Sequence, residues 1–177
     1  KYVSFDLGMV QGLNYYTGDL VKFDLSKGDD GYARRFYPPD ADLSETGFLA
    51  NDPQGFMDAI RWISQFDLPI YITENGCEDG KDDFRRRYLL QHLHALWKMI
   101  NQNIPVKGYF HWSLTDNFEW ERGWSQKFGL WELDPATQIR TKRKSVDLYA
   151  EICRGNAITS ELVEKFAPEE YDKLYPA

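Results

Sequence analysis

Cysteine and histidine are scarce in this chain of 177 residues, which contains two cysteines and three histidines. Cys77 and Cys153 lie far apart without the spacing of metal ligands, so free thiols in a reducing compartment are expected. His92 and His94 are two positions apart on a predicted helix, which points them to different faces and predicts ordinary structural roles. Neither a metal nor a cofactor is expected.

Long apolar runs and an excess of positive charge are also missing. No stretch approaches the roughly 20 apolar residues of a membrane span. The 21 Lys and Arg are outnumbered by 28 Asp and Glu, a net charge of −7 that argues against nucleic acid and anionic membrane as partners. The one basic cluster, Arg140 to Lys144, is interpreted as a solvated turn. Lys1-Tyr2-Val3 shows neither a signal-peptide layout nor an initiator Met, so an internal start and a cytoplasmic location are expected.

Aromatic residues, by contrast, are abundant. They make up 16% of the chain, with 6 Trp, 11 Tyr and 11 Phe. Two explanations compete for this excess: the thick core of a larger body, or flat platforms for a ligand with apolar faces, such as a sugar ring.

Predicted strands and helices alternate along the chain, which is treated as a single segment of residues 1–177. Strands are predicted within residues 10–23, at 68–72 and at 106–112, with a long loop at 24–50 and a tryptophan-rich loop at 113–131. Helices are predicted from Asp52-Pro53 onward, at 84–102, near 145–153 and near 159–166. This order predicts an α/β fold with a parallel sheet and its function at the carboxyl ends of the strands. Three such units cannot close an eight-stranded barrel.

The apolar faces of the two longest predicted helices follow helical spacing. The residues assigned to these faces are Phe56, Ile60, Ile63 and Phe66 in the first helix, and Phe84, Tyr88, Leu93, Leu96, Trp97 and Ile100 in the second.

A carboxylate, Glu74, stands where the apolar run 68–72 ends and a polar, glycine-containing loop begins. That is where parallel α/β folds carry their chemistry, although a surface residue in a turn has the same pattern. Asn14 and Tyr16 follow another strand, so Glu74 could act as a nucleophile at an anomeric carbon, with the Tyr16 hydroxyl orienting it and Asn14 contacting a neighbouring sugar hydroxyl.

The third strand end adds an aromatic surface. Trp112, Glu119 and Trp120 would offer indole planes to the C–H faces of a sugar, and a carboxylate to its hydroxyls. Core packing is the alternative role for Trp112 and Trp124, and for Trp124 it is favoured. A charged residue among so many aromatics needs a partner, which supports a binding role for Glu119.

These segments resemble glycoside hydrolase family 1, the β-glucosidases and their relatives. Ile72-Thr73-Glu74-Asn75-Gly76 resembles the nucleophile motif of the family, and Gly108 to Trp120 resembles its signature on the last barrel strand. Phe128-Gly129-Leu130, Asn14-Tyr15-Tyr16-Thr17 and Asp82 to Tyr88 are similar to three further segments. The resemblance covers roughly residues 10–166, and it implies a fold that is the C-terminal part of a (β/α)8 TIM barrel, about strands six to eight.

The resemblance also implies roles for individual residues. Glu74 would be the nucleophile of a retaining β-glucosidase and Tyr16 its hydrogen-bond partner. The substrate-binding residues would be Asn14 near the 2-hydroxyl, Trp112 under the sugar, Glu119 and Trp120 at the outer hydroxyls, and Phe128 near the 6-position. Phospho-glycosidases of the family replace Glu119 by a small residue, so a non-phosphorylated glycoside is expected as the substrate.

One part of the family pattern is missing. The acid/base glutamate belongs to an Asn-Glu-Pro motif on the fourth strand, and this sequence contains no such motif. The loop after Glu74 is also shorter than in many relatives. The chain is therefore expected to need the N-terminal part of the same barrel, on the same or a separate chain, and to be inactive alone.

Two other interpretations fit parts of the sequence. A non-enzymatic carbohydrate-binding or assembly fragment would keep the sugar platform without the chemistry, but its open barrel seam would face water. Residues 12–18 also look like a Gly-Leu-Asp-Tyr-Tyr-Thr-Gly stretch of histidyl-tRNA synthetase-like proteins, yet nothing downstream supports that class and the acidic balance opposes tRNA binding.

Overall fold

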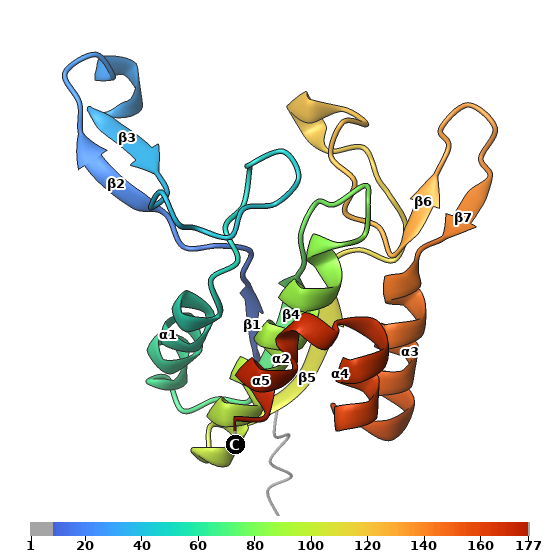
Figure 1. The fold of residues 1–177 in the computed structure, drawn as a ribbon. Coiled ribbons are helices and arrows are strands. Elements are labelled where there is room, and N and C mark those ends of the chain that lie inside the picture. Colours follow the sequence, from blue (N-terminus) through green and yellow to red (C-terminus); the bar gives the residue numbers. More distant parts are fainter. Residues whose placement is uncertain (1–8, 177) are drawn as a thin grey trace, which may run out of the picture.

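The computed structural model describes residues 9–176 and has a three-stranded parallel sheet at its centre (Figure 1). Strands β1 (Gln11–Asn14), β4 (Ile70–Asn75) and β5 (Val106–His111) pair in the order β1-β4-β5. Helix α1 (Pro53–Ser64) connects the first pair and α2 (Phe84–Asn101) the second. The predicted order of parallel βα units is therefore confirmed.

Two antiparallel hairpins project beyond the carboxyl ends of these strands, at the top of Figure 1. One joins β2 (Leu20–Phe23) to β3 (Ala33–Phe36), and the other joins β6 (Trp131–Leu133) to β7 (Arg140–Lys142). The chain ends with α3 (Lys144–Gly155), α4 (Ser160–Phe166) and α5 (Tyr171–Leu174). Short 3-10 helices occupy Gly28–Asp30, Trp120–Arg122 and Pro168–Glu170.

The two faces of the sheet differ in burial. Successive side chains of β4 point to opposite faces of the sheet. Those of Ile70 and Ile72 point to the face covered by α1 and α2, where both are fully buried in a shared core. The other face carries Asn14 and Thr73, which are exposed, and Phe110, whose exposed fraction is 58%. In this part of the chain the helices cover one face of the sheet and leave the other accessible.

The hydrophobic core continues along α2 into the C-terminal helices. Leu89 and Leu90 of α2 pack with Leu148 and Ile152 of α3 and with Val163 of α4. Helix α1 begins at a proline and is capped by Asp52, whose carboxylate accepts a hydrogen bond from the Gly55 amide at 2.9 Å.

The structure corrects several details of the predicted elements. Phe66 lies beyond the end of α1 and is exposed, and Trp97 and Ile100 of α2 are exposed as well. Strand β4 runs through Glu74 to Asn75 and does not stop at residue 72. Strand β2 lies within the extended segment predicted up to residue 23, but β3 falls inside the loop predicted at 24–50. Strands β6 and β7, which begin at the end of the loop predicted at 113–131, were not predicted, because strands of three or four residues leave little periodicity in a sequence.

The Arg140–Lys144 cluster is not simply a solvated turn. Residues 140–142 form β7, α3 begins at Lys144, and Arg143 between them is buried. Cys77 is buried and Cys153 exposed, and both are free thiols as expected. His92 lies fully buried against the ring of Tyr88, in the structural role that was predicted. Across residues 9–176 no helix has the length and apolarity needed to cross a membrane.

Candidate active site

The site is built around the contact between β1 and β4 at the carboxyl end of the sheet. The Tyr16 hydroxyl donates a hydrogen bond to Oε2 of Glu74 at 2.5 Å, and the Tyr15 amide donates to the Glu74 carbonyl oxygen at 2.9 Å. Burial, together with the hydrogen bond to the Glu74 carboxylate, raises the pKa of Tyr16 far above its usual value, so the phenol remains a hydrogen-bond donor. The sequence predicted this pair, and the structure brings it together.

Asn14 lies on the accessible face of the sheet beside the same strand. Its Oδ1 accepts a hydrogen bond from the Thr73 hydroxyl at 2.6 Å, and its Cα pairs in register with Glu74. Asn14, Tyr16 and Glu74 therefore converge at one end of the β1–β4 pair.

Trp112 and Glu119 form a second group after β5. The Trp112 indole nitrogen lies 3.5 Å from Oε1 of Glu119, and the Asn117 side-chain amide donates to the same oxygen at 2.5 Å. Both donors act on Oε1, which leaves Oε2 of the carboxylate available to hydroxyl groups. Asn117 was not predicted as a site residue, although it stands two residues before Glu119 in the same loop.

Trp120 and Phe128 lie in contrasting environments. Trp120 has an exposed fraction of 82%, whereas Phe128 is buried and packs edge-on against Tyr16, with ring centroids 5.9 Å apart. Phe128 thereby links the tryptophan-rich loop to the tyrosine that contacts Glu74. Trp124 is only partly buried and packs edge-on against Phe118, outside the main core clusters.

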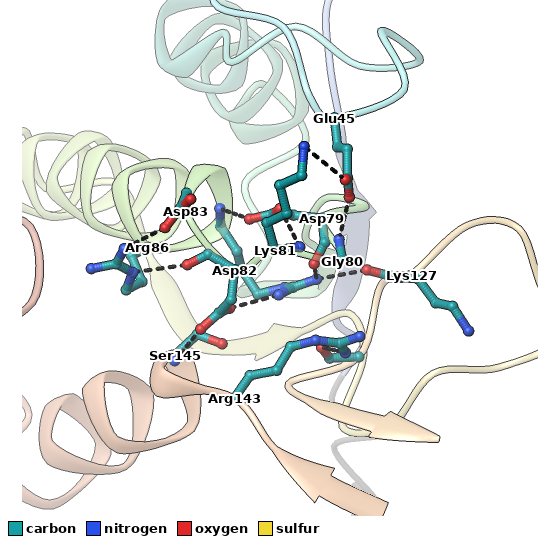
Figure 2. Close-up of polar contacts among 12 residues, drawn as sticks. Glu45, Asp79, Gly80, Lys81, Asp82, Asp83, Arg86, Lys127, Arg143 and Ser145 are labelled. Carbon is teal, nitrogen blue, oxygen red and sulfur yellow. Dashed lines mark hydrogen bonds and ion pairs between the residues drawn. The ribbon is translucent and has the colours of Figure 1, made fainter. Parts of the chain in front are cut away.

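The loop that carries Glu119, Trp120 and Phe128 is tied to α3 by a buried ion pair. The Arg143 guanidinium forms a bidentate ion pair with the Asp116 carboxylate, in which Nη1 donates to Oδ1 and Nη2 to Oδ2, each at 3.0 Å. The amide of Gly129 also donates to Asp116 at 2.8 Å, and Arg143 donates to the Gly129 carbonyl at 2.7 Å. Figure 2 shows Arg143 directed toward this loop.

The loop after β4 is held by a second buried network. Arg85, at the start of α2, donates to the Asp82 carboxylate at 2.6 Å and to the carbonyl oxygens of Asp79 and Lys127. The other Asp82 oxygen accepts from the Ser145 amide at 2.8 Å, a contact drawn in Figure 2. The loop that follows Glu74 is therefore fastened to α2, α3 and the tryptophan-rich loop.

Gly76 shows how closely the two loops approach. A Cβ at this position would overlap the carbonyl oxygen of Trp112, and the Trp112 amide donates to the Asn75 carbonyl at 3.0 Å. The Trp112–Ser113 peptide is cis. The backbone that carries Trp112 thus lies directly against the backbone that follows Glu74.

The arrangement offers carboxylates, a phenol and indole surfaces. Within residues 9–176 no group of three or more His, Cys, Asp or Glu side chains is arranged to hold a metal ion. A cavity of about 770 Å³ lies elsewhere, between α2, the start of β5 and α3. The site thus combines a carboxylate held by a phenol with partly exposed indole surfaces.

Comparisons with known proteins agree with this arrangement. Relatives include a β-galactosidase of Pyrococcus woesei, 36% identical over 87% of this chain and 33% of the relative, and β-glucosidase A of Thermotoga maritima, 37% identical over 83% of this chain and 34% of the relative. The chain thus spans about a third of the length of these curated relatives.

Solved structures give the same result. A β-glycosidase from Pyrococcus horikoshii superposes with a TM-score of 0.79 at 33% identity, covering 89% of this chain and 37% of that one. A β-glucosidase from Thermotoga maritima in complex with glucoimidazole superposes with a TM-score of 0.74 at 34% identity, covering 84% and 35%. These relatives are TIM-barrel glycosidases, of which this chain corresponds to a part.

The family assignment covers most of the chain. The sequence model of the family described as Glycosyl hydrolase family 1 matches residues 6–158, which include both strand-end groups of the site. The chain therefore belongs to glycosyl hydrolase family 1.

Proposed function

We propose that this chain is the C-terminal part, about strands six to eight, of the barrel of a retaining β-glycosidase that removes terminal non-reducing β-D-glucosyl residues. The observation that carries the proposal is the 2.5 Å hydrogen bond from Tyr16 to Oε2 of Glu74 at the carboxyl end of β4. It holds one carboxylate oxygen and leaves Oε1 to attack an anomeric carbon.

The proposed reaction has two steps. Glu74 displaces the aglycone and forms a covalent glycosyl-enzyme, and water then releases the sugar with retained configuration. Retaining enzymes place a second carboxyl group about 5–5.5 Å from the nucleophile to protonate the leaving oxygen. Glu119 is held by Asn117 and Trp112 and is assigned to hydroxyl binding, so the acid must come from a segment outside these 177 residues.

The substrate-binding roles follow the two groups of the site. Trp112 forms the platform under the ring, Glu119 and Trp120 bind the outer hydroxyls, Asn14 lies near the 2-hydroxyl and Phe128 near the 6-position. One relative is a 6-phospho-β-galactosidase of Streptococcus equi, 34% identical, so the family alone does not decide for or against a phosphorylated sugar. The Glu119 carboxylate would repel a phosphate, which favours a non-phosphorylated glycoside.

The partner of this chain is the N-terminal part of the same barrel. The sheet ends at β1 on one side and at β5 on the other, and parallel sheets in α/β proteins are normally covered and, in barrels, closed. The covering strands would supply the acid/base carboxylate and the contacts to the remaining sugar hydroxyls. We call this chain joined to that preceding part of the barrel the complete enzyme; β-glucosidase A of Thermotoga maritima can supply the part in a chimera.

The test compares the isolated chain with the complete enzyme on an aryl β-glucoside. We expect turnover by the complete enzyme and none by the isolated chain. Glu74→Ala in the complete enzyme should abolish turnover, and added azide or formate should restore part of it. Glu132→Ala, which removes an exposed carboxylate on β6, is the matched control and should keep full activity. Near-normal activity in Glu74→Ala, or robust turnover by the isolated chain, would refute the proposal.

A further inference from the structure

Behind Glu74 lies a buried amide whose hydrogen bonds join all three strand ends. Asn75 is fully buried, and its Nδ2 donates to the Tyr15 carbonyl at 2.8 Å and to the Tyr88 hydroxyl at 3.1 Å. Its Oδ1 accepts from the Tyr109 hydroxyl at 2.9 Å. Both amide protons and the amide oxygen are therefore engaged, by partners that come from the β1 end, from α2 and from β5.

The Tyr88 hydroxyl extends this network to the residue that contacts Glu74. It donates to the Tyr16 carbonyl oxygen at 2.7 Å while accepting from Asn75. The Tyr88 ring is fully buried and stacks on His92 with 3.7 Å between centroids. Burial raises the pKa of Tyr88 well above its usual value, so its proton stays in place as the donor to Tyr16.

The sheet ladder is irregular at this point, although the Tyr15 amide still donates to the Glu74 carbonyl oxygen at 2.9 Å. The β1–β4 register shifts between Leu13 and Asn14, and the β4–β5 register shifts between Ile72 and Asn75. Irregularities of this kind interrupt ladder hydrogen bonds and re-aim side chains. Side-chain hydrogen bonds from Asn75 and Tyr88 therefore add to that single backbone contact in setting the relative positions of Tyr16 and Glu74.

We propose that Tyr88 and Asn75 are positioning residues for the reaction, because together they hold the backbones of Tyr16 and Glu74 at the separation that the Tyr16–Glu74 hydrogen bond requires. Neither side chain touches the sugar; they act through the two residues that do. This inference rests on the proposed role of Glu74 as nucleophile.

Removal of the Tyr88 hydroxyl isolates the effect. In Tyr88→Phe the ring and its stacking on His92 remain, but the Tyr16 carbonyl loses its donor and Asn75 loses one acceptor. A buried polar group without its partner drives local rearrangement. Small displacements of a reacting group lower the rate of attack far more than they weaken the binding of a sugar that is held by other contacts.

The experiment measures covalent trapping of the complete enzyme by a 2-deoxy-2-fluoro-β-glucosyl fluoride, with glucoimidazole as the non-covalent sugar-shaped inhibitor. In Tyr88→Phe we expect the trapping rate constant to fall about tenfold, with the inhibition constant for glucoimidazole changing less than about twofold. The rate constant is taken per labelled site, so loss of folded protein alone does not change it. Tyr175→Phe, which removes a hydroxyl bonded to the Ile158 carbonyl at 2.7 Å far from the site, is the control.

The possible outcomes separate the two proposals. An unchanged trapping rate constant in Tyr88→Phe overturns the positioning role, whereas trapping of the parent enzyme at a residue other than Glu74 overturns the proposed function itself. If Tyr88→Phe does not fold, Tyr109→Phe decides the question, because it removes the donor to Oδ1 of Asn75 from the opposite side. A trapping rate constant that is several-fold lower in Tyr109→Phe supports the positioning role, and an unchanged rate constant overturns it.

Discussion

The buried contact between Asp116 and Arg143 provides the sharpest test of how the sugar-binding loop is held. The Asp116 side chain is fully buried and that of Arg143 is 5% exposed, with two N–O distances of 3.0 Å. Replacing Asp116 by Asn keeps the volume but removes the negative charge. It leaves the guanidinium buried without its counter-ion and turns one carboxylate oxygen into an amide that faces it.

The magnitude follows from the burial of the pair. Removing one member of a buried ion pair destabilises by about 3–5 kcal/mol. That loss is a large fraction of the roughly 5–15 kcal/mol that separates folded from unfolded domains. Asp116 also accepts hydrogen bonds from the amides of Gly129 and Leu133, so the change loosens the segment that leads to Phe128 as well. We therefore expect Asp116→Asn to lie near the upper end of this range and to raise KM for the glycoside.

The assay is urea unfolding of the complete enzyme, completed as a double-mutant cycle with Arg143→Met. Removing both charges together should restore part of the lost stability, because an apolar replacement leaves no buried ion without its partner. Glu151→Gln is the control, since its pair with Arg154 is exposed and should contribute less than about 1 kcal/mol. A loss below about 1 kcal/mol for Asp116→Asn would refute the reasoning, because it would show that the charge is not buried in the assembled protein.

Three further predictions concern the framework of the site. Gly76→Ala should abolish activity and lower the melting temperature, because the added Cβ overlaps the Trp112 carbonyl oxygen. Gly155→Ala, whose added Cβ meets no atom within 4 Å, should change neither. Equal activities and melting temperatures of the two variants would contradict the close approach of the Gly76 and Trp112 backbones. Burial lowers the pKa of His92 and His111 to about 3, below the unfolded value of 6.5. The unfolded state therefore binds more protons between these values, and stability should fall as the pH drops below 6.5, by up to about 1.4 kcal/mol per pH unit for each histidine. Urea midpoints measured between pH 7 and 5 test this, and a midpoint independent of pH would rule it out. Asp52→Ala should cost about 1 kcal/mol in urea unfolding by removing the cap of α1, whereas the exposed Asp58→Ala should stay within about 0.5 kcal/mol; a cap variant as stable as the control would count against the capping role.

Strand ends were the part of the site that the sequence predicted well. An apolar run such as 68–72 has few alternatives to a buried strand, and the next polar side chain then falls at the edge of the sheet. Glu74 and Tyr16 were placed together on that basis, and the structure joins them by a hydrogen bond. Trp112 and Glu119 were likewise assigned to one group and lie in contact.

The buried polar contacts could not be predicted in the same way. Arg143 stands in a basic run whose other members are exposed or flank a helix start, and its partner Asp116 is 27 residues away. No local pattern marks such a pair, because burial of a charge depends on where the chain returns in space. Strands β3 and β7 were not predicted for a related reason, since they are short, solvent-exposed and without apolar alternation.

The accessible face of the sheet carries the residues that a covering segment would contact. Ile70 and Ile72 of β4 are buried against the helices. Asn14 of β1, Thr73 of β4 and the apolar ring of Phe110 of β5 lie exposed on the opposite face of the sheet. A large exposed aromatic beside polar groups is typical of a surface that another segment covers. On the proposed function, the covering strands must bring apolar side chains against Phe110 and a carboxyl group about 5–5.5 Å from Glu74. Both requirements apply at the same sheet end, so closure of the barrel and completion of the acid/base pair would be a single event.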